Sequence, residues 1–263
     1  MTTPIPFAPD RFRHAAAHYL TGRPAYAPAL IRRVAQLCGL DGSQRMLDIG
    51  CGPGQLSLAF STWVDSALAI DPEPAMLQVA TELGAGVAPN VEYRQGSSYD
   101  LSPELGRFQF VAIGRAFHWM DRLDTLARLD GMLDVGGAIA LFSTQARDDA
   151  AAPWMSAYRA LMERYAADDP ARAQHRGPDW EHHDSVLLRS PFRRLERIAI
   201  VDERRVSAGQ LRARPLSMSS LSRDRLGARL DTLLGEIDEL TAAYATDGWL
   251  IERIESIALI GRR

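Results

Sequence analysis

Three glycines at alternate positions follow a short apolar segment and can form a ligand-binding loop. The segment 45–49 precedes Gly50, Gly52 and Gly54. Glycine lets the chain turn sharply and lets a ligand approach the backbone where a Cβ would intrude, and the free N–H groups of a following helix favour a polar or anionic ligand. Position 55 is Gln, so the third glycine comes one residue earlier than the dinucleotide pattern G-x-G-x-x-G requires. The loop predicts a ligand site and argues against a dehydrogenase, with a plain strand-to-helix turn as the alternative.

Polar residues also follow the next two expected strands. Asp71 stands at the end of the second strand, 17 residues after Gly54, where a carboxylate can accept hydrogen bonds from both hydroxyls of a ribose and would repel a 2′-phosphate. Asp71 could also cap the helix that follows, and the two roles are compatible. The third strand is followed by the tetrapeptide 95–98, Gln-Gly-Ser-Ser. This tetrapeptide lies where the base of a nucleoside would be, beside the ribose.

Two further segments carry side chains that can take part in a reaction. Residues 114–121, after the fourth expected strand, contain His118 and Trp119. His118 could accept a proton from an attacking oxygen, nitrogen or carbon acid, or it could pack on Trp119 and only shape a pocket. In the segment 19–26, Arg23 offers a planar donor fork that suits a carboxylate, with a surface ion pair as an equal alternative.

Apolar segments that alternate with helical patterns define the elements that must position these residues. The expected strands of the first half are 45–49, 67–70, 91–94, 108–113 and 137–143. The expected helices before and between them are 10–20, 28–38, 55–63, 73–83 and 123–133. Nearly continuous apolar strands separated by helices indicate a parallel sheet that is covered on both faces. The second half is expected to contain polar helices at 146–190, a strand at 195–206, two helices at 208–244 and a last strand at 249–260.

The acid-preceded glycine loop, Asp71 and Ser97, in this order, resemble the class I S-adenosylmethionine-dependent methyltransferases over residues 45–143. The His118-Trp119 pair and the stretch 19–26 resemble the small-molecule, trans-aconitate-like subgroup (methyltransferase type 11). The resemblance implies an α/β, Rossmann-like, doubly wound sheet of seven strands, mostly parallel, with an antiparallel last strand and a helical cap. We expect a single domain over 1–263, divided into N-terminal lid helices (1–40), a cofactor-binding core (41–145), a helical cap insertion (146–190), and strands and helices that complete the sheet (191–263).

The same resemblance assigns roles to individual residues, with S-adenosylmethionine as cofactor and S-adenosylhomocysteine as product. Asp48 would lie beneath the loop near the cofactor amine, and Asp71 would bind the ribose. Ser97 would accept a hydrogen bond from the adenine amine, where the family often has an acid. The implied cofactor-binding set is Asp48, Gly50, Gly52, Gly54, Asp71, Pro72, Met76, Ser97, Ser98 and Arg115. The implied catalytic set is Tyr19, Arg23 and His118, with residues 8–26 closing as a lid, and Ser217-Met218-Ser219 resembles a segment near the substrate pocket.

Composition limits the possible partners. The net charge of −3 gives no strong positive field for nucleic acid or an anionic membrane. All 30 basic residues are Arg, which excludes a lysine Schiff base or phosphate-loop lysine. Cys38 and Cys51 do not form a disulfide framework or a zinc site. Adjacent His182 and His183 on a helix would diverge by about 100°, so the stretch 181–184 is interpreted as a solvated face and no metal is expected.

These features together predict an enzyme of small-molecule metabolism. We expect methyl transfer to an oxygen or nitrogen, less readily a carbon, of a small organic acceptor. The alternatives are a protein that binds the cofactor without turnover and an S-adenosylmethionine-dependent enzyme of other chemistry, such as cyclisation. Residues 1–10 lack the pattern of a signal peptide, and no apolar stretch is long enough to span a membrane. We therefore expect a cytoplasmic monomer or homodimer.

Overall fold

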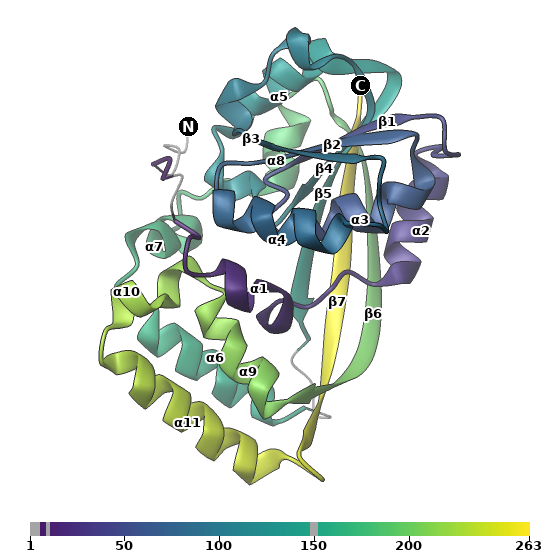
Figure 1. Cartoon of the computed structure of the whole chain (residues 1–263). Helices are drawn as coiled ribbons and strands as arrows, with labels where there is room; N and C mark the ends of the chain where they lie inside the picture. Colours follow the sequence, from purple (N-terminus) through teal and green to yellow (C-terminus); the bar gives the residue numbers. More distant parts are fainter. Residues whose placement is uncertain (1–5, 9–10, 148–151) are drawn as a thin grey trace.

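The computed structural model describes residues 6–8, 11–147 and 152–263. Within these ranges the strands form one sheet with the order β3-β2-β1-β4-β5-β7-β6 (Figure 1). The strands are β1 (Arg45–Ile49), β2 (Ser66–Asp71), β3 (Val91–Gln95), β4 (Phe108–Gly114), β5 (Leu133–Ala146), β6 (Arg194–Ser207) and β7 (Trp249–Arg262). The pairs among β1 to β5 are parallel, whereas β7 is antiparallel to both β5 and β6. The expected seven-stranded, mostly parallel sheet with an antiparallel last strand is confirmed.

Helices cover both faces of this sheet because alternate strand residues point to opposite sides. On one face, Met46 and Phe110 pack in a core with side chains of α2 (Pro28–Leu37) and α3 (Gln55–Phe60). On the other face, Leu47 belongs to a second core with side chains from the helices α5 (Arg122–Met132) and α8 (His183–Leu188). The remaining elements of this part are α4 (Pro74–Gly84) and the 3₁₀ turns η1 (Ser61–Trp63), η2 (Ser98–Asp100), η3 (Pro103–Leu105) and η4 (Phe117–Trp119).

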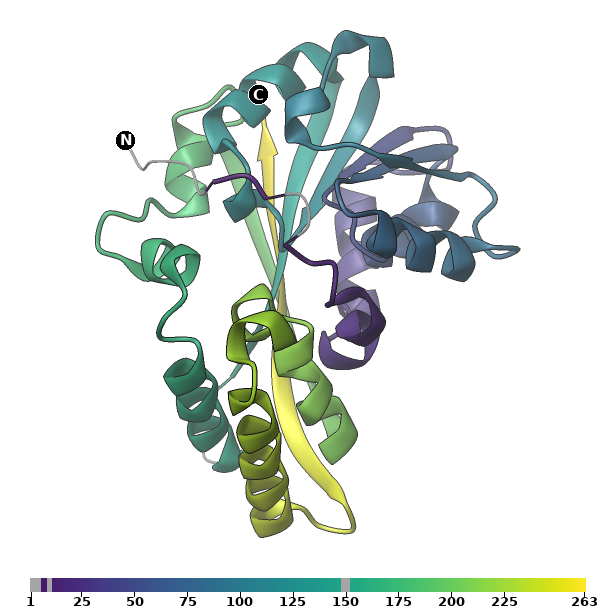
Figure 2. The same ribbon diagram turned by 60° about the vertical axis from the view of Figure 1, so that its left-hand side comes forward.

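A second group of helices packs on the long ends of β6 and β7 (Figure 2). Its core joins Trp154, Leu211 and Leu233 to Val206 and Leu250 of the two strands. Besides α8, the helices that follow β5 are α6 (Trp154–Tyr165), α7 (Pro170–Arg176), α9 (Ala208–Leu216), η5 (Ser219–Leu221), α10 (Arg223–Leu226) and α11 (Arg229–Tyr244). Within the expected cap at 146–190, of which 148–151 lie outside the described residues, α6 shares a hydrophobic core with helices from later in the chain, whereas α8 packs in a core of the sheet. No helix in the described ranges is long and apolar enough to cross a membrane.

The N-terminal helix lies between the sheet and these helices (Figure 1). Helix α1 spans Ala16–Gly22, so the expected helix over 10–20 was wrong in its start. Residues 11–15 form turns instead, and 9–10, like most of the segment 1–10 considered for a signal peptide, lie outside the described residues. Side chains of the turn pack on Met76 of α4, and this tertiary contact competes with helix continuation.

A close crossing fixes α1 against α9. A Cβ on Gly22 would collide with the carbonyl oxygen of Ala213 in α9, so only glycine permits this approach. The N–H of the next residue, Arg23, closes the helix by donating to the carbonyl of Tyr19. The crossing therefore sets the position of both Tyr19 and Arg23.

We predict that Gly22→Ala lowers the free energy of unfolding by about 1–3 kcal/mol, because the added methyl forces α1 away from α9. The measurement is urea unfolding followed by circular dichroism. Gly235→Ala is the matched control: Gly235 is exposed within α11 with no atom within 4 Å of an added Cβ. The control should gain up to about 1 kcal/mol from helix propensity. Equal effects of the two substitutions would contradict the close crossing.

Candidate active site

The three loop glycines all adopt positive φ, and they do so for different reasons. Their φ values are +67° for Gly50, +54° for Gly52 and +78° for Gly54. A Cβ on Gly50 would clash with Ala116, and one on Gly54 would lie 2.9 Å from the hydroxyl oxygen of Tyr93. A Cβ on Gly52 would have no atom within 4 Å. Packing therefore explains two of the glycines, whereas Gly52 borders open space that a ligand can fill.

Asp71, at the end of β2, holds this loop in place. One carboxylate oxygen accepts a hydrogen bond from the N–H of Gly52 at 2.8 Å, and the other accepts from the N–H of Glu73 at 2.9 Å. The side chain is 8% exposed, and burial raises the pKa of Asp71 to about 6. An ionised carboxylate can accept about four hydrogen bonds, so two positions stay available to a ligand.

Asp48 lies beneath the loop in an almost dry environment. Its residue is 1% exposed, and Oδ2 accepts hydrogen bonds from the N–H and the hydroxyl of Ser57. The other oxygen, Oδ1, is buried without a partner among the described residues. Burial raises the pKa of Asp48 to about 7. A cation placed near Oδ1 would satisfy this oxygen and favour the ionised form.

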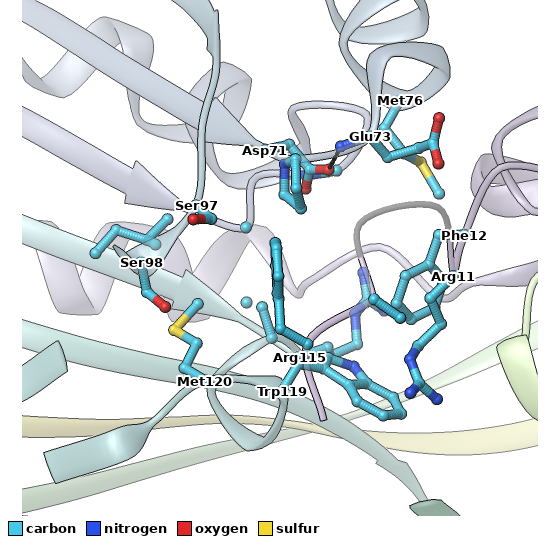
Figure 3. Close-up of a pocket in the computed structure, with 18 of the residues that line it drawn as sticks. Arg11, Phe12, Asp71, Glu73, Met76, Ser97, Ser98, Arg115, Trp119 and Met120 are labelled. Atoms are coloured by element: carbon cyan, nitrogen blue, oxygen red, sulfur yellow. Dashed lines mark hydrogen bonds between the residues drawn. The ribbon is translucent and has the colours of Figure 1, made fainter. Parts of the chain in front are cut away.

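A cavity of about 100 Å³ lies over Gly52, and we call it the loop cavity. Figure 3 shows Asp71 and Met76 on one wall and Arg115 and Trp119 on the opposite wall. Its roof comes from the N-terminal segment and includes Pro6, Phe7, Ala8, Arg11, Phe12 and Tyr19. Ring contacts hold this roof to the core: the guanidinium of Arg11 lies 4.5 Å from the Trp119 ring centre, the Phe12 ring packs edge-on against the Trp119 ring, and the Phe7 ring packs edge-on against that of Tyr99.

The two serines after β3 both line the loop cavity, but one is already engaged. The hydroxyl of Ser97 donates to Asp100 at 2.7 Å and accepts a hydrogen bond from the N–H of Tyr99. This arrangement caps the 3₁₀ turn η2. One lone pair of Ser97 stays available for a ligand, while Ser98 lines the cavity without such a capping role. Pro72 and Met76 line the cavity as well, whereas Asp48 and Gly54 are not among its lining residues.

Arg115 stands at the junction with a second cavity. Its backbone adopts φ +56° directly after β4. Its guanidinium donates to the carbonyl of Pro24 at 3.0 Å and to the side chain of Gln55, and it lies 4.7 Å from the ring centre of Tyr26. The Nε of Arg115 is buried without a hydrogen-bond partner among the described residues.

The second cavity measures about 630 Å³ and is called the cap cavity. It lies between the ends of β4, β5 and β7 and the elements α7, α8 and η5, and it shares Phe12, Tyr19, Arg115 and Trp119 with the loop cavity. Of these two cavities, Arg23 and His118 line only the cap cavity, and Arg23 also lines a third cavity of about 140 Å³ together with Tyr158 and Arg214. Met218 and Ser219 line it too, and Ser217 accepts a hydrogen bond from Arg23 through its carbonyl.

His118 belongs to a cluster of rings on one wall of the cap cavity. Its ring centre lies 4.6 Å from that of Trp119, 4.8 Å from that of His175 and 6.4 Å from that of His183. Burial lowers the pKa of His118 well below its usual range, and the neighbouring histidines and arginines add to the shift. His118 is therefore neutral at physiological pH and a weak base.

Comparison with known proteins shows which family the region around the loop cavity resembles. A family model described as "Methyltransferase domain" matches residues 46–137. This segment is therefore similar to methyltransferase domains. The expected resemblance to methyltransferases is confirmed for this segment, which contains the glycine loop, Asp71 and His118.

Relatives of the methyltransferase domain are distant. An uncharacterized methyltransferase of Schizosaccharomyces pombe is 27% identical over 154 residues, which cover 58% of this chain and 59% of that protein. The trans-aconitate 2-methyltransferase of Mycobacterium tuberculosis is 30% identical over 159 residues, 59% of this chain and 54% of that one. The chain thus spans little more than half the length of these two relatives. An S-adenosylmethionine-dependent methyltransferase from Geobacter sulfurreducens, solved with S-adenosylhomocysteine, shares the fold with a TM-score of 0.54, 17% identity and full coverage of both chains.

The sequence interpretation missed part of the site around the methyltransferase domain. In the stretch 181–184, expected as a solvated face, His182 and Asp184 are exposed and His183 is half-buried, and all three also line the cap cavity. The expectation that His182 lies within a helix was wrong, because α8 begins at His183 and His182 is its extended N-cap. His175 and Trp180 were not singled out at all, although their ring centres lie 4.6 Å apart beside His118. No group of three or more His, Cys, Asp or Glu in the described ranges could hold a metal ion.

We predict that His183 makes the protein acid-sensitive. Burial and the nearby Arg122 lower its pKa from 6.5 to about 4, so the unfolded chain binds a proton between pH 6.5 and pH 4 that the folded chain does not. Stability is thus lost as the pH falls below 6.5. From pH 7 to pH 5, His183→Gln should lose about 2 kcal/mol less free energy of unfolding than the wild type does. Parallel urea titrations at both pH values measure this difference, and identical losses would contradict a buried, neutral His183.

Proposed function

We propose that this protein transfers a methyl group from S-adenosylmethionine to an oxygen or nitrogen atom of a small organic acceptor. The observation that carries the proposal is the junction of two cavities. The loop cavity, with its open space over Gly52, adjoins the larger cap cavity, and both are lined by Tyr19, Arg115 and Trp119. Two ligands bound in the two cavities would therefore meet beside these residues. The methyltransferase domain and the S-adenosylhomocysteine complex of the related fold support the choice of cofactor.

The residues around the loop cavity fit this cofactor. Asp71 accepts hydrogen bonds from the ribose hydroxyls through its two available positions. Pro72 and Met76 contact the adenine, and Ser97 and Ser98 border its edge. Gly50 and Gly54 shape the loop through packing, and the open space beside the Cα of Gly52 leaves room for the ligand.

The charged ends of the cofactor find matching groups. Asp48, which lies beneath the loop with Oδ1 unpartnered among the described residues, stabilises the cofactor amine through its negative charge. The unpaired Nε of Arg115 donates to its carboxylate. When bound, S-adenosylmethionine supplies a methyl group on a positively charged sulfur.

The protein promotes the reaction mainly by holding the two reactants next to each other in the right orientation. Tyr19 lines both cavities and orients the acceptor against the cofactor. Alignment of two bound reactants removes much of the entropic barrier to a bimolecular reaction. His118 packs against Trp119 and shapes the wall of the cap cavity. Its lowered pKa makes it a weak proton acceptor, so we assign it no role in proton transfer. The size of the cap cavity suits a small organic molecule.

The roof of the loop cavity has to open for the cofactor. A volume of about 100 Å³ is below the roughly 300–1,000 Å³ typical of small-molecule sites. Ala8, Arg11, Phe12 and Tyr19 of the segment 8–26 form this roof together with Pro6 and Phe7, and residues 9–10 lie outside the described ranges. We therefore retain the proposal that 8–26 is a lid, held closed by the contacts of Arg11 and Phe12 with Trp119.

We predict that Gly52→Ala weakens S-adenosylhomocysteine binding at least tenfold, because the methyl occupies the space that the cofactor fills. Isothermal titration calorimetry measures the change. Gly39→Ala is the matched control: Gly39 has φ +65° and no atom within 4 Å of an added Cβ, yet it does not line the loop cavity. Both variants should lose about 1–2 kcal/mol of stability from left-handed strain. Wild-type affinity in folded Gly52→Ala would remove the loop from the site.

We also predict that cofactor binding releases a proton near neutral pH. With a pKa of about 7, Asp48 is half protonated at pH 7 in the free protein, and the cofactor amine favours its ionised form. Calorimetry with S-adenosylhomocysteine at pH 7 in phosphate and in Tris should report release of up to about half a proton per bound ligand. In Asp48→Asn the dependence on buffer should largely disappear. A binding enthalpy that is the same in both buffers for the wild type would contradict the role of Asp48.

A further inference from the structure

Strand β6 forms an outer edge of the sheet and is long and regular for an exposed edge (Figure 1). It spans 14 residues, Arg194–Ser207, and contains neither Pro nor Gly. Its residues pair with β7 one for one, from Arg194 opposite Arg262 to Ser207 opposite Trp249, without a bulge. Among the described residues, no backbone–backbone hydrogen bond from outside the sheet reaches β6. The outer side of β6 therefore presents a long row of backbone N–H and C=O groups that another strand can pair with.

The charges of β6 are arranged so that the strand is complementary to itself. Proteins commonly protect an edge with a short strand, a bulge, a proline or charged side chains, and of these β6 has only the charges. They occur as two Glu-Arg pairs, Glu196-Arg197 in the first half and Glu203-Arg204 in the second. Three of these side chains are exposed and Arg204 is half-buried. Because antiparallel pairing reverses one strand, each Glu of one copy can face an Arg of the other.

We infer that β6 joins two copies of this chain into a homodimer, paired antiparallel around a two-fold axis at Ile200, with one sheet continuous across both copies. Glu196 then lies opposite Arg204 of the second copy, and Arg197 lies opposite Glu203 of the second copy. The axis repeats both pairs. Side chains directly opposite each other in an antiparallel pair share a face and interact, and opposite charges there are stabilising.

The same charges disfavour the neighbouring registers. A shift of two residues in one direction places Arg194 opposite Arg204, and the same shift in the other direction places Arg197 opposite Arg205. A further shift in the first direction leaves the residues 203–207 without a strand residue opposite them. A shift of one residue would turn the side chains of the second copy to the wrong face. The register centred on Ile200 is therefore the one that uses nearly all of β6 and keeps unlike charges together.

Pairs within the chain leave these charges available. Glu196 and Glu203 each pair with an arginine of β7, Arg262 and Arg253 respectively, but an ionised carboxylate can accept about four hydrogen bonds. Arg197 is exposed and forms no ion pair with a carboxylate of the described residues. The dimer thus adds partners to the acids and supplies one to Arg197.

Apolar contacts and the cap cavity also bear on this interface. Ala199 lies opposite Val201 of the second copy, and in the single chain Val201 is 50% exposed. Pairing therefore removes apolar surface from water. Arg197 also lines the cap cavity, so Glu203 of the second copy would lie at the rim of that cavity. The inference itself does not depend on the proposed function, because it concerns the mass of the assembly.

Sedimentation equilibrium with a charge-swap cycle tests the interface. The wild-type protein should have the mass of two chains at micromolar concentration. Arg197→Glu and Glu203→Arg should each weaken the dimer Kd at least tenfold, because each places two pairs of like charges opposite each other. The double variant Arg197→Glu/Glu203→Arg should return to within threefold of the wild-type Kd. Glu239→Arg, the same charge change at an exposed position of α11, is the matched control and should leave the Kd unchanged.

Two results of the cycle overturn the inference. One is a wild-type protein that stays monomeric, which would leave the edge to a different partner or to none. The other is a dimer whose Kd the single variants do not change, or do not recover in the double variant, since the dimer would then use another face. Circular dichroism checks that each variant is folded.

A cysteine on the axis tests the register without changing any charge of the two Glu-Arg pairs. In Ile200→Cys the two thiols face each other across the axis, and directly opposite Cα atoms lie about 4.5–5.5 Å apart, within the range of a disulfide. Mild oxidation should give a covalent dimer on a non-reducing gel. In the control Asp202→Cys the two thiols lie about 13 Å apart along the strands and should not cross-link. Cross-linking of Asp202→Cys but not of Ile200→Cys, or of the wild type through Cys38 and Cys51 alone, overturns the inferred pairing.

Discussion

The hydrogen bond between the N–H of Gly52 and the carboxylate of Asp71 is the interaction on which the site depends. It ties the loop after β1 to the end of β2 and keeps Gly52 in a left-handed conformation with open space beside its Cα. The parallel pairing of β1 with β2 brings these two strand ends to the same edge of the sheet. A nucleoside can thus approach bare backbone and a carboxylate at once, and the rest of the site is arranged around this point.

Electrostatics divides the site into two halves. Beneath and beside the loop lie two buried acids, Asp48 and Asp71, whose raised pKa values reflect burial. Toward the cap lie Arg23 and Arg115 without acidic partners. In the proposed complex the cofactor amine lies toward the acids and the cofactor carboxylate toward Arg115.

The sequence predicted the sheet well because its strands are encoded locally. The expected strands 45–49, 91–94 and 108–113 correspond to β1, β3 and β4 with bounds that agree within one residue. The glycine loop and Asp71 could also be located, since their function follows from their place directly after a strand. The start of α1 could not, because the packing of Phe12 and Ala15 near Met76, from a distant helix, decides it. The clustering of the His175, Trp180 and His183 rings near His118 was missed for the same reason, since it depends on how α7 and α8 fold against the end of β4.

Transfer of a deuterated methyl group from S-adenosylmethionine to the components of a small-molecule extract, followed by mass spectrometry, tests the central claim most directly. The account predicts that one component gains a single labelled methyl group in place of a proton in the presence of the wild-type protein. It also predicts that the same signal is lost with Gly52→Ala and retained with Gly39→Ala. A wild-type protein that binds S-adenosylhomocysteine yet labels no component would contradict the account, because the joined cavities would then hold a cofactor without passing on its methyl group.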